Sequence, residues 1–159
     1  MSTGAVSDAI SLRWPSLSGQ FVNRFLPSIK FEALDVPLWA PAVLRRINEL
    51  NALPSVDPYS TTPLNIPDVL AALRFLTRNM RNDTLPPWIG RLGSGGLQLT
   101  WHCGDVEVEA VFDTARDEFD VLVAVAGNEW DAPAGEAEPL FAQVVDRLSR
   151  SHFEYLSAD

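Results

Sequence analysis

The stretch LQLTWHCGDVEVEAVF, residues 97–112, decides the fold of this chain. Apolar and polar side chains alternate along both of its halves, which is the period of a β-strand with one buried face. The halves are joined by Gly104 and Asp105, and glycine at the first central position is typical of a two-residue hairpin turn. The stretch therefore predicts an antiparallel β-hairpin.

The same turn predicts the register of the hairpin. It places four apolar pairs on one face: Cys103 with Val106, Trp101 with Val108, Leu99 with Ala110, and Leu97 with Phe112. It places two polar pairs on the other face: His102 with Glu107, and Thr100 with Glu109. A slip of one residue would turn both glutamates toward the core, so we expect this register and a buried Trp101.

Helical periodicity precedes the hairpin. One helix is expected from Pro41 to Pro54, and a second opens at Pro67 and ends by Asn82. The apolar stripe of the second helix faces away from three arginines and a phenylalanine: Arg74, Arg78, Arg81 and Phe75. Residues 12–41 show no clean period, so we expect a packed but irregular arm there and a flexible tail over residues 1–11.

Strand periodicity continues beyond the hairpin, where residues 119–126 are apolar on both faces. That pattern suits a strand covered on two sides or an interface. The sequence predicts an α+β fold with a helical N-terminal half, an antiparallel β-meander of three to five strands and a C-terminal helix packed on the sheet. The expected ranges are a single domain over 12–159, comprising the arm and helices over 12–85, the meander over 86–131 and the last helix over 136–150.

Composition favours a soluble protein of the cytoplasm. Cys103 is the one cysteine, so no intrachain disulfide can form, and the sequence does not open with a secretory leader. The longest apolar run, residues 121–126, is far below the ~20 residues that span a bilayer. We therefore expect no membrane segment.

The net charge of −9 is unevenly distributed. Between Gly104 and Asp146 there are twelve Asp and Glu residues and one base, Arg116, whereas the rest of the chain has nine acids and eleven bases. Such an acidic segment repels nucleic acid and attracts basic proteins. We therefore expect no nucleic-acid partner.

One motif resembles a known family. The run Gly95-Gly96-Leu97-Gln98-Leu99-Thr100-Trp101-His102, with the alternating acids after it, resembles the GG-x-Q-L-x-W-H motif of a family of small bacterial proteins without an established activity. The match covers residues 95–109. The resemblance implies a β-hairpin with a polar face and supplies no catalytic role.

The polar face of the hairpin is the candidate site for chemistry. His102 beside Glu107 and Glu109 could bind a divalent metal or act as a base steered by an acid, and Gln98 and Thr100 extend that face. The alternative is a set of solvated cross-strand pairs, since no second histidine lies nearby in sequence. We predict no catalytic residue, no metal and no cofactor.

These patterns favour a non-enzymatic module that docks a basic partner protein, as an antitoxin, immunity protein or chaperone-like subunit does. The expected contact residues are acidic side chains and two aromatic anchors: Glu107, Glu109, Asp117, Asp120, Phe75 and Trp130. Two alternatives stay open, a small enzyme or metal-binding domain centred on His102, and a homo-oligomer that associates through residues 119–126.

Overall fold

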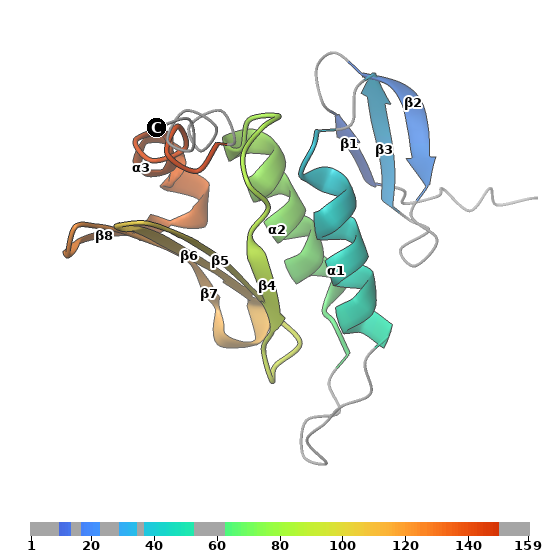
Figure 1. Ribbon diagram of the computed structural model, residues 1–159. Helices are drawn as coiled ribbons and strands as arrows, with labels where there is room; N and C mark the ends of the chain where they lie inside the picture. The colour runs from blue at the N-terminus through green and yellow to red at the C-terminus, as the bar shows by residue number, and fades with distance from the viewer. Residues whose placement is uncertain (1–9, 14–16, 23–28, 35–36, 53–62, 150–159) are drawn as a thin grey trace, which may run out of the picture. The chain divides into compact units, whose positions relative to one another are not determined.

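The computed structural model describes residues 10–13, 17–22, 29–34, 37–52 and 63–149 (Figure 1). Contacts within the chain divide it into two compact units, residues 1–36 and residues 37–159. The single domain expected over residues 12–159 stays a prediction.

The first unit contains three strands where the sequence analysis expected an irregular arm. They are β1 (Ile10–Arg13), β2 (Leu17–Val22) and β3 (Ile29–Leu34), in the order β1-β3-β2. β3 pairs in parallel with β1 and antiparallel with β2. The lack of a clean sequence period in this segment therefore does not mean an absence of strands.

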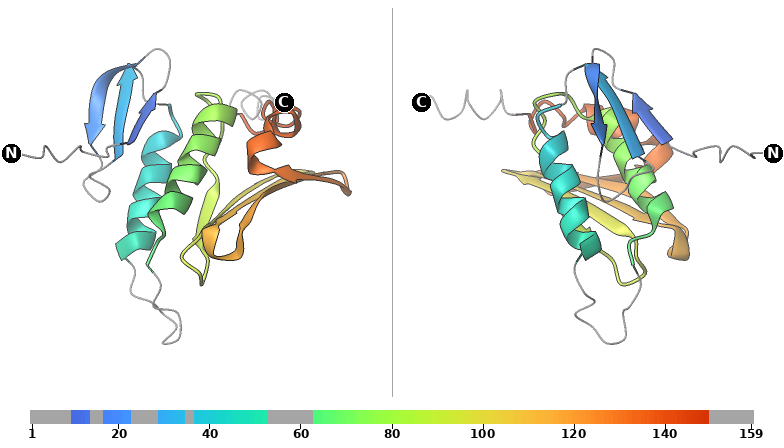
Figure 2. Two further views of the ribbon diagram at one scale, coloured as in Figure 1. Left: turned by 180° about the vertical axis from the view of Figure 1, so that it is seen from behind. Right: turned by 90° about the vertical axis from the view of Figure 1, so that its right-hand side faces the viewer.

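The second unit combines helices with one antiparallel sheet, so the fold is α+β. Helices α1 (Ala40–Ala52) and α2 (Ile66–Asn79) come first. A meander follows, with its strands in chain order: β4 (Trp88–Arg91), β5 (Leu97–Cys103), β6 (Val106–Asp113), β7 (Glu118–Val125) and β8 (Asn128–Pro133). The helices lie on one face of the sheet, α1 against β4 and α2 against β5 and β6 (Figure 2). The five strands confirm the expected meander.

The predicted hairpin register is confirmed. All four apolar pairs and both polar pairs stand opposite each other across β5 and β6 as expected. Gly104 begins the turn with φ = 60°, a backbone conformation that glycine adopts without a steric penalty. The turn and the alternation of apolar residues thus act together to fix which face meets the helices.

The face of the sheet toward the helices, the inner face, carries the core. Trp101 is buried there, and its Nε1 donates a hydrogen bond to the carbonyl oxygen of Leu85 at 2.9 Å. Aromatic rings join the sheet to α2 and to helix α3 (Glu138–Ala142): Trp101 to Phe141 at 5.4 Å, Phe141 to Phe75 at 5.6 Å, and Phe75 to Phe112 at 5.7 Å. Burying each such ring stabilises the fold by ~1.5–3 kcal/mol.

The C-terminal helix is shorter than the expected range of 136–150. After the 3-10 helix η2 (Ala134–Glu136), helix α3 covers Glu138–Ala142 and the chain continues in turns to Leu148. The apolar stripe is nevertheless buried as a regular helix would bury it, at Phe141, Val144, Val145 and Leu148. Residues 150–159 lie outside the described part of the chain.

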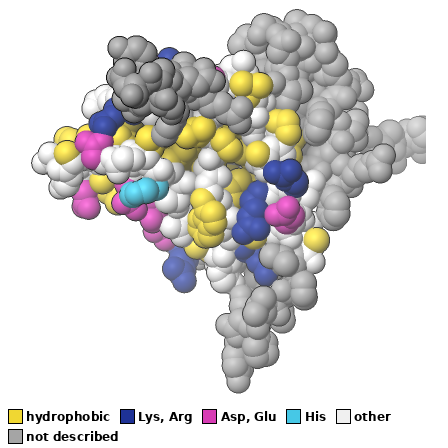
Figure 3. Space-filling view, in the orientation of Figure 1, with side chains coloured by type: hydrophobic (Ala, Val, Ile, Leu, Met, Phe, Trp, Pro, Cys, Tyr) yellow, Lys and Arg dark blue, Asp and Glu magenta, His cyan; other side chains and the backbone are white. Residues whose placement is uncertain are grey.

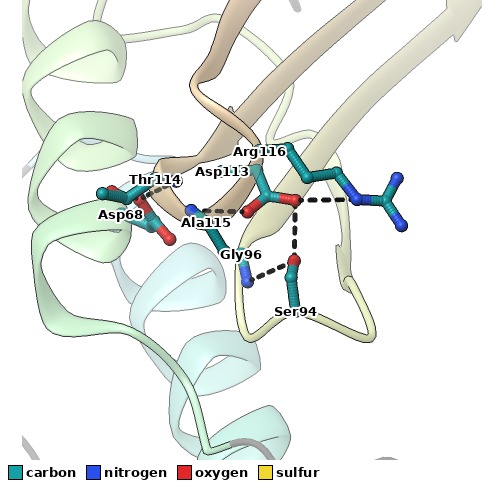
Figure 4. A network of polar contacts seen from close by, with 7 residues as sticks. All are labelled: Asp68, Ser94, Gly96, Asp113, Thr114, Ala115 and Arg116. Carbon is teal, nitrogen blue, oxygen red and sulfur yellow. Dashed lines mark hydrogen bonds and ion pairs between the residues drawn. The ribbon is translucent and has the colours of Figure 1, made fainter.

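A network of buried carboxylates fastens the turns of the sheet to α2 (Figure 4). Asp113 accepts hydrogen bonds from the Ser94 hydroxyl at 2.6 Å and from the Ala115 N–H at 3.1 Å. Asp68 of α2 accepts from both the N–H and the hydroxyl of Thr114, which opens the 3-10 helix η1 (Thr114–Arg116). The two carboxylates thus join the β4–β5 turn, the β6–β7 connection and α2.

Candidate functional site

On the opposite face of the sheet, the outer face, none of the described helices of the second unit packs. Apart from the terminal pair Asp113 and Glu118, where Asp113 turns into the buried network, the strand registers assign to it these residues: Trp88, Gly90, Gln98, Thr100, His102, Glu107, Glu109, Val111, Asp120, Leu122, Ala124, Glu129, Asp131 and Pro133. None of them is buried, whereas the inner-face neighbours Ile89, Leu99 and Val121 are at most 1% exposed. The named residues of the outer face are therefore accessible to solvent.

Carboxylates dominate the charge of the outer face. Apart from that terminal pair, five of these residues are acidic: Glu107, Glu109, Asp120, Glu129 and Asp131. Its strand positions include no Lys or Arg, and its one histidine is His102. In Figure 3, most of the acidic side chains in view lie over the sheet, and most of the basic ones lie over α1 and β4. The outer face thus presents a field of one sign.

The polar site predicted from the sequence does assemble on this face. Gln98, Thr100, His102, Glu107 and Glu109 all belong to it, with His102 opposite Glu107. His102 and Glu107 are exposed, and no hydrogen bond or ion pair joins their side chains. Across the described residues, no three His, Cys, Asp or Glu side chains are grouped as ligands of a metal ion.

A pocket of about 270 Å³ lies at the edge of the sheet beside His102. It forms where β4 begins opposite Thr100, so that the end of β5 has no neighbouring strand on that side. Trp88, Thr100 and His102 line it together with the half-buried Cys103. The Cys103 thiol donates to the carbonyl oxygen of Arg147 at 3.4 Å, as expected of a cysteine that packs rather than reacts.

Trp88 is the aromatic residue that the sequence analysis missed. Its side chain is 61% exposed on the outer face, and Leu122, in the same cross-strand row, is 38% exposed. A Cβ added at Gly90 would lie 2.6 Å from Cη2 of Trp88, so the indole rests over the glycine backbone. Extending the hairpin register through the 93–96 turn would have placed Trp88 opposite Thr100, on the polar face.

The two aromatic anchors predicted from the sequence lie elsewhere. Phe75 is 5% exposed, so the expectation that it is a surface anchor is wrong, because the sheet and α3 both cover that side of α2. Trp130 is 47% exposed, but its partner Val123 belongs to the inner face. Asp117, also expected at the contact, is exposed at the β6–β7 connection with φ = 53°.

No family model, curated protein or solved structure matches this chain. The resemblance of residues 95–109 to the bacterial GG-x-Q-L-x-W-H family therefore stays a prediction. Within the described ranges, no helix has the length and apolar character needed to cross a bilayer.

Proposed function

We propose that this chain is a non-enzymatic binding protein that docks a basic partner protein on the outer face of its sheet. The observation that carries the proposal is the composition of that face, with five carboxylates and no Lys or Arg around two exposed apolar side chains, Trp88 and Leu122. An antitoxin or immunity protein that covers a basic surface fits this role.

The charges and the apolar residues have different tasks in such a complex. A field of one sign speeds the encounter with an oppositely charged partner, and the effect falls with ionic strength. Exposed aromatic residues near the centre of an interface supply most of the energy that holds partners together. Trp88 and Leu122 flank Thr100 and Glu109 in one row across the strands, so carboxylate and apolar contacts would form side by side.

A second candidate is a small enzyme or metal-binding domain at His102, Glu107 and Glu109. The edge pocket supports it, because a reaction needs a concave site and His102 lines one. Titrating the purified chain with Zn²⁺ tests this candidate. Binding that is lost in His102→Ala would favour it over docking.

A third candidate is self-association through β7. The exposed Leu122 supports it, and it predicts a dimer that Leu122→Glu dissociates.

A capture experiment with matched variants tests docking. One variant carries Glu107→Gln, Glu109→Gln and Glu129→Gln on the outer face. Its control carries Glu49→Gln, Glu136→Gln and Glu138→Gln, which remove the same charge from exposed positions elsewhere. At low salt, a specific basic protein should bind the unaltered chain and the control but not the outer-face variant. Equal retention by the two variants, or no basic protein retained by the unaltered chain, would overturn the proposal.

A further inference from the structure

A second pocket, of about 310 Å³, lies on the helix side of the sheet. It is bordered by α2, by the facing ends of β6 and β7, and by η2, all within the second unit. Its lining includes Arg74, Phe75, Arg78 and Asn79 of α2, Phe119 of β7 and Ala134 of η2. None of its lining residues is acidic, although the chain carries a net charge of −9.

The floor of this pocket is aromatic and firmly held. Phe75 and Phe112 are 5% and 1% exposed, and their ring centroids lie 5.7 Å apart. Phe119 packs edge-on against Phe112 at 6.4 Å. Each ring is fixed by its neighbours, so the floor is a preformed apolar surface of the kind that small ligands occupy.

Two arginines stand at the rim without acidic partners. Arg74 and Arg78 are exposed, lie one helical turn apart on one side of α2, and form no ion pair with any described residue. By contrast, four other arginines each pair with a carboxylate: Arg46 with Glu49, Arg81 with Asp146, Arg116 with Asp113, and Arg147 with Asp105. Arg74 and Arg78 therefore place positive charge without an acidic partner among the described residues beside the aromatic floor.

Asn79 also lines the pocket. Its Nδ2 donates to the carbonyl oxygen of Phe75 at 2.8 Å, whereas its Oδ1 is buried and has no hydrogen-bond donor among the described residues. Because the Oδ1 atom is not exposed to the pocket, Asn79 contributes to the lining through the rest of its side chain and not as a hydrogen-bond partner of a ligand.

We propose that this pocket binds a small monocarboxylate with an apolar or aromatic body. The planar guanidinium groups of Arg74 and Arg78 match a carboxylate, and charge-assisted hydrogen bonds of this kind are among the strongest. The body would lie on Phe75 and Phe119, in a volume about twice that of a cavity of ~150 Å³ that holds benzene. The pocket lies on the other side of the sheet from the docking face and does not depend on it.

A titration with two ligands of similar shape, one charged and one uncharged, tests the proposal. The full chain labelled with ¹⁵N is titrated with 4-phenylbutyrate and, separately, with the uncharged 4-phenylbutyramide. The carboxylate should produce saturable shifts at the amides of Phe75, Asn79 and Gly135. It should bind at least about tenfold more tightly than the amide, because only the carboxylate forms charge-assisted hydrogen bonds.

Three single variants test whether Arg74 and Arg78 supply the positive charge that binds the carboxylate. Arg74→Gln and Arg78→Gln should each weaken carboxylate binding by roughly three- to tenfold and leave amide binding unchanged. Arg45→Gln, an exposed arginine of α1 outside the pocket, should bind like the unaltered chain. All three positions are on the surface, and the spectra of the free variants report whether each is folded.

Three results would overturn the proposal: no saturable shift with millimolar 4-phenylbutyrate, equal binding of the two probes, or equal behaviour of the Arg45 and rim variants.

Discussion

The two faces of the five-stranded sheet come from the same strands, yet they differ in almost every physical property. On the inner face, Ile89, Leu99 and Val121 form a cross-strand row that is at most 1% exposed. On the outer face, the adjacent row contains Trp88, Glu109 and Leu122 and is open to solvent. The period of two allows one sequence to specify a core and a candidate binding surface independently. Substitutions on the inner face should therefore alter stability, and substitutions on the outer face should alter association.

The largest effect is expected from two tryptophans on opposite faces. Trp101→Ala should lower the free energy of unfolding by ~3–5 kcal/mol, because it removes a buried ring and the hydrogen bond to Leu85. Trp88→Ala removes a side chain that is 61% exposed and should cost less than ~1 kcal/mol. Urea denaturation of both variants measures the difference. Equal losses of unfolding free energy would mean that Trp101 and Trp88 do not lie on opposite faces of the sheet, contrary to the register.

The next effect concerns the buried network at the end of the sheet. Asp113→Ala leaves the Ser94 hydroxyl and the Ala115 N–H without their acceptor, and should destabilise the chain by about 2–3 kcal/mol. Asp113→Asn is the matched control, since it keeps an oxygen that can accept one of the two bonds. The midpoint of thermal unfolding should be highest for the unaltered chain, lower for Asp113→Asn and lowest for Asp113→Ala. An Ala variant as stable as the unaltered chain would show that the network does not hold the turns.

The sequence predicted the parts of this fold whose partners are close along the chain. The β5–β6 register followed from a two-residue turn and six alternating pairs of positions, because both act within one hairpin. The three strands of the first unit were missed. β1 pairs in parallel with β3, which follows it in sequence only after β2, and such a pairing has no signature in a local turn. Long-range pairing leaves little trace in local periodicity.

The candidate site, too, was predicted only where local alternation decides which face a residue lies on. The polar residues of the hairpin were assigned to one face correctly, since their side chains follow the alternation. Phe75 was misplaced, because a helical wheel assumes a single buried stripe, whereas α2 packs both on Phe112 of the sheet and on Phe141 of α3. Trp88 was missed because its face depends on the register across the 93–96 turn.

Association with a basic partner should respond to charge on the outer face more than to charge elsewhere. The triple reversal Glu107→Lys, Glu109→Lys and Asp120→Lys should slow association by roughly tenfold at low salt, and raising the salt should mimic it. Charges act over about one Debye length, ~8 Å at physiological salt, so reversal of Glu49, Glu136 and Glu138 should have a smaller effect. Both rate constants are measured by surface plasmon resonance against the captured partner. An association rate indifferent to salt and to the outer-face reversals would remove the acidic face from the mechanism.

The smallest expected change in the free energy of unfolding tests whether the outer face is open to solvent or covered by a second copy of the chain. His102→Ala, Glu107→Ala and Glu109→Ala should each change the free energy of unfolding by less than ~1 kcal/mol, because these side chains contact solvent and no ion pair joins His102 to Glu107. Glu109 is the most informative of the three, since it is only partly exposed and lies between Thr100 and Leu122 in its row. Its loss should remain within the same limit when measured by urea denaturation at several protein concentrations. A cost above ~2 kcal/mol that grows with concentration would instead place a second copy of the chain on this face, since binding stabilises the folded state by mass action.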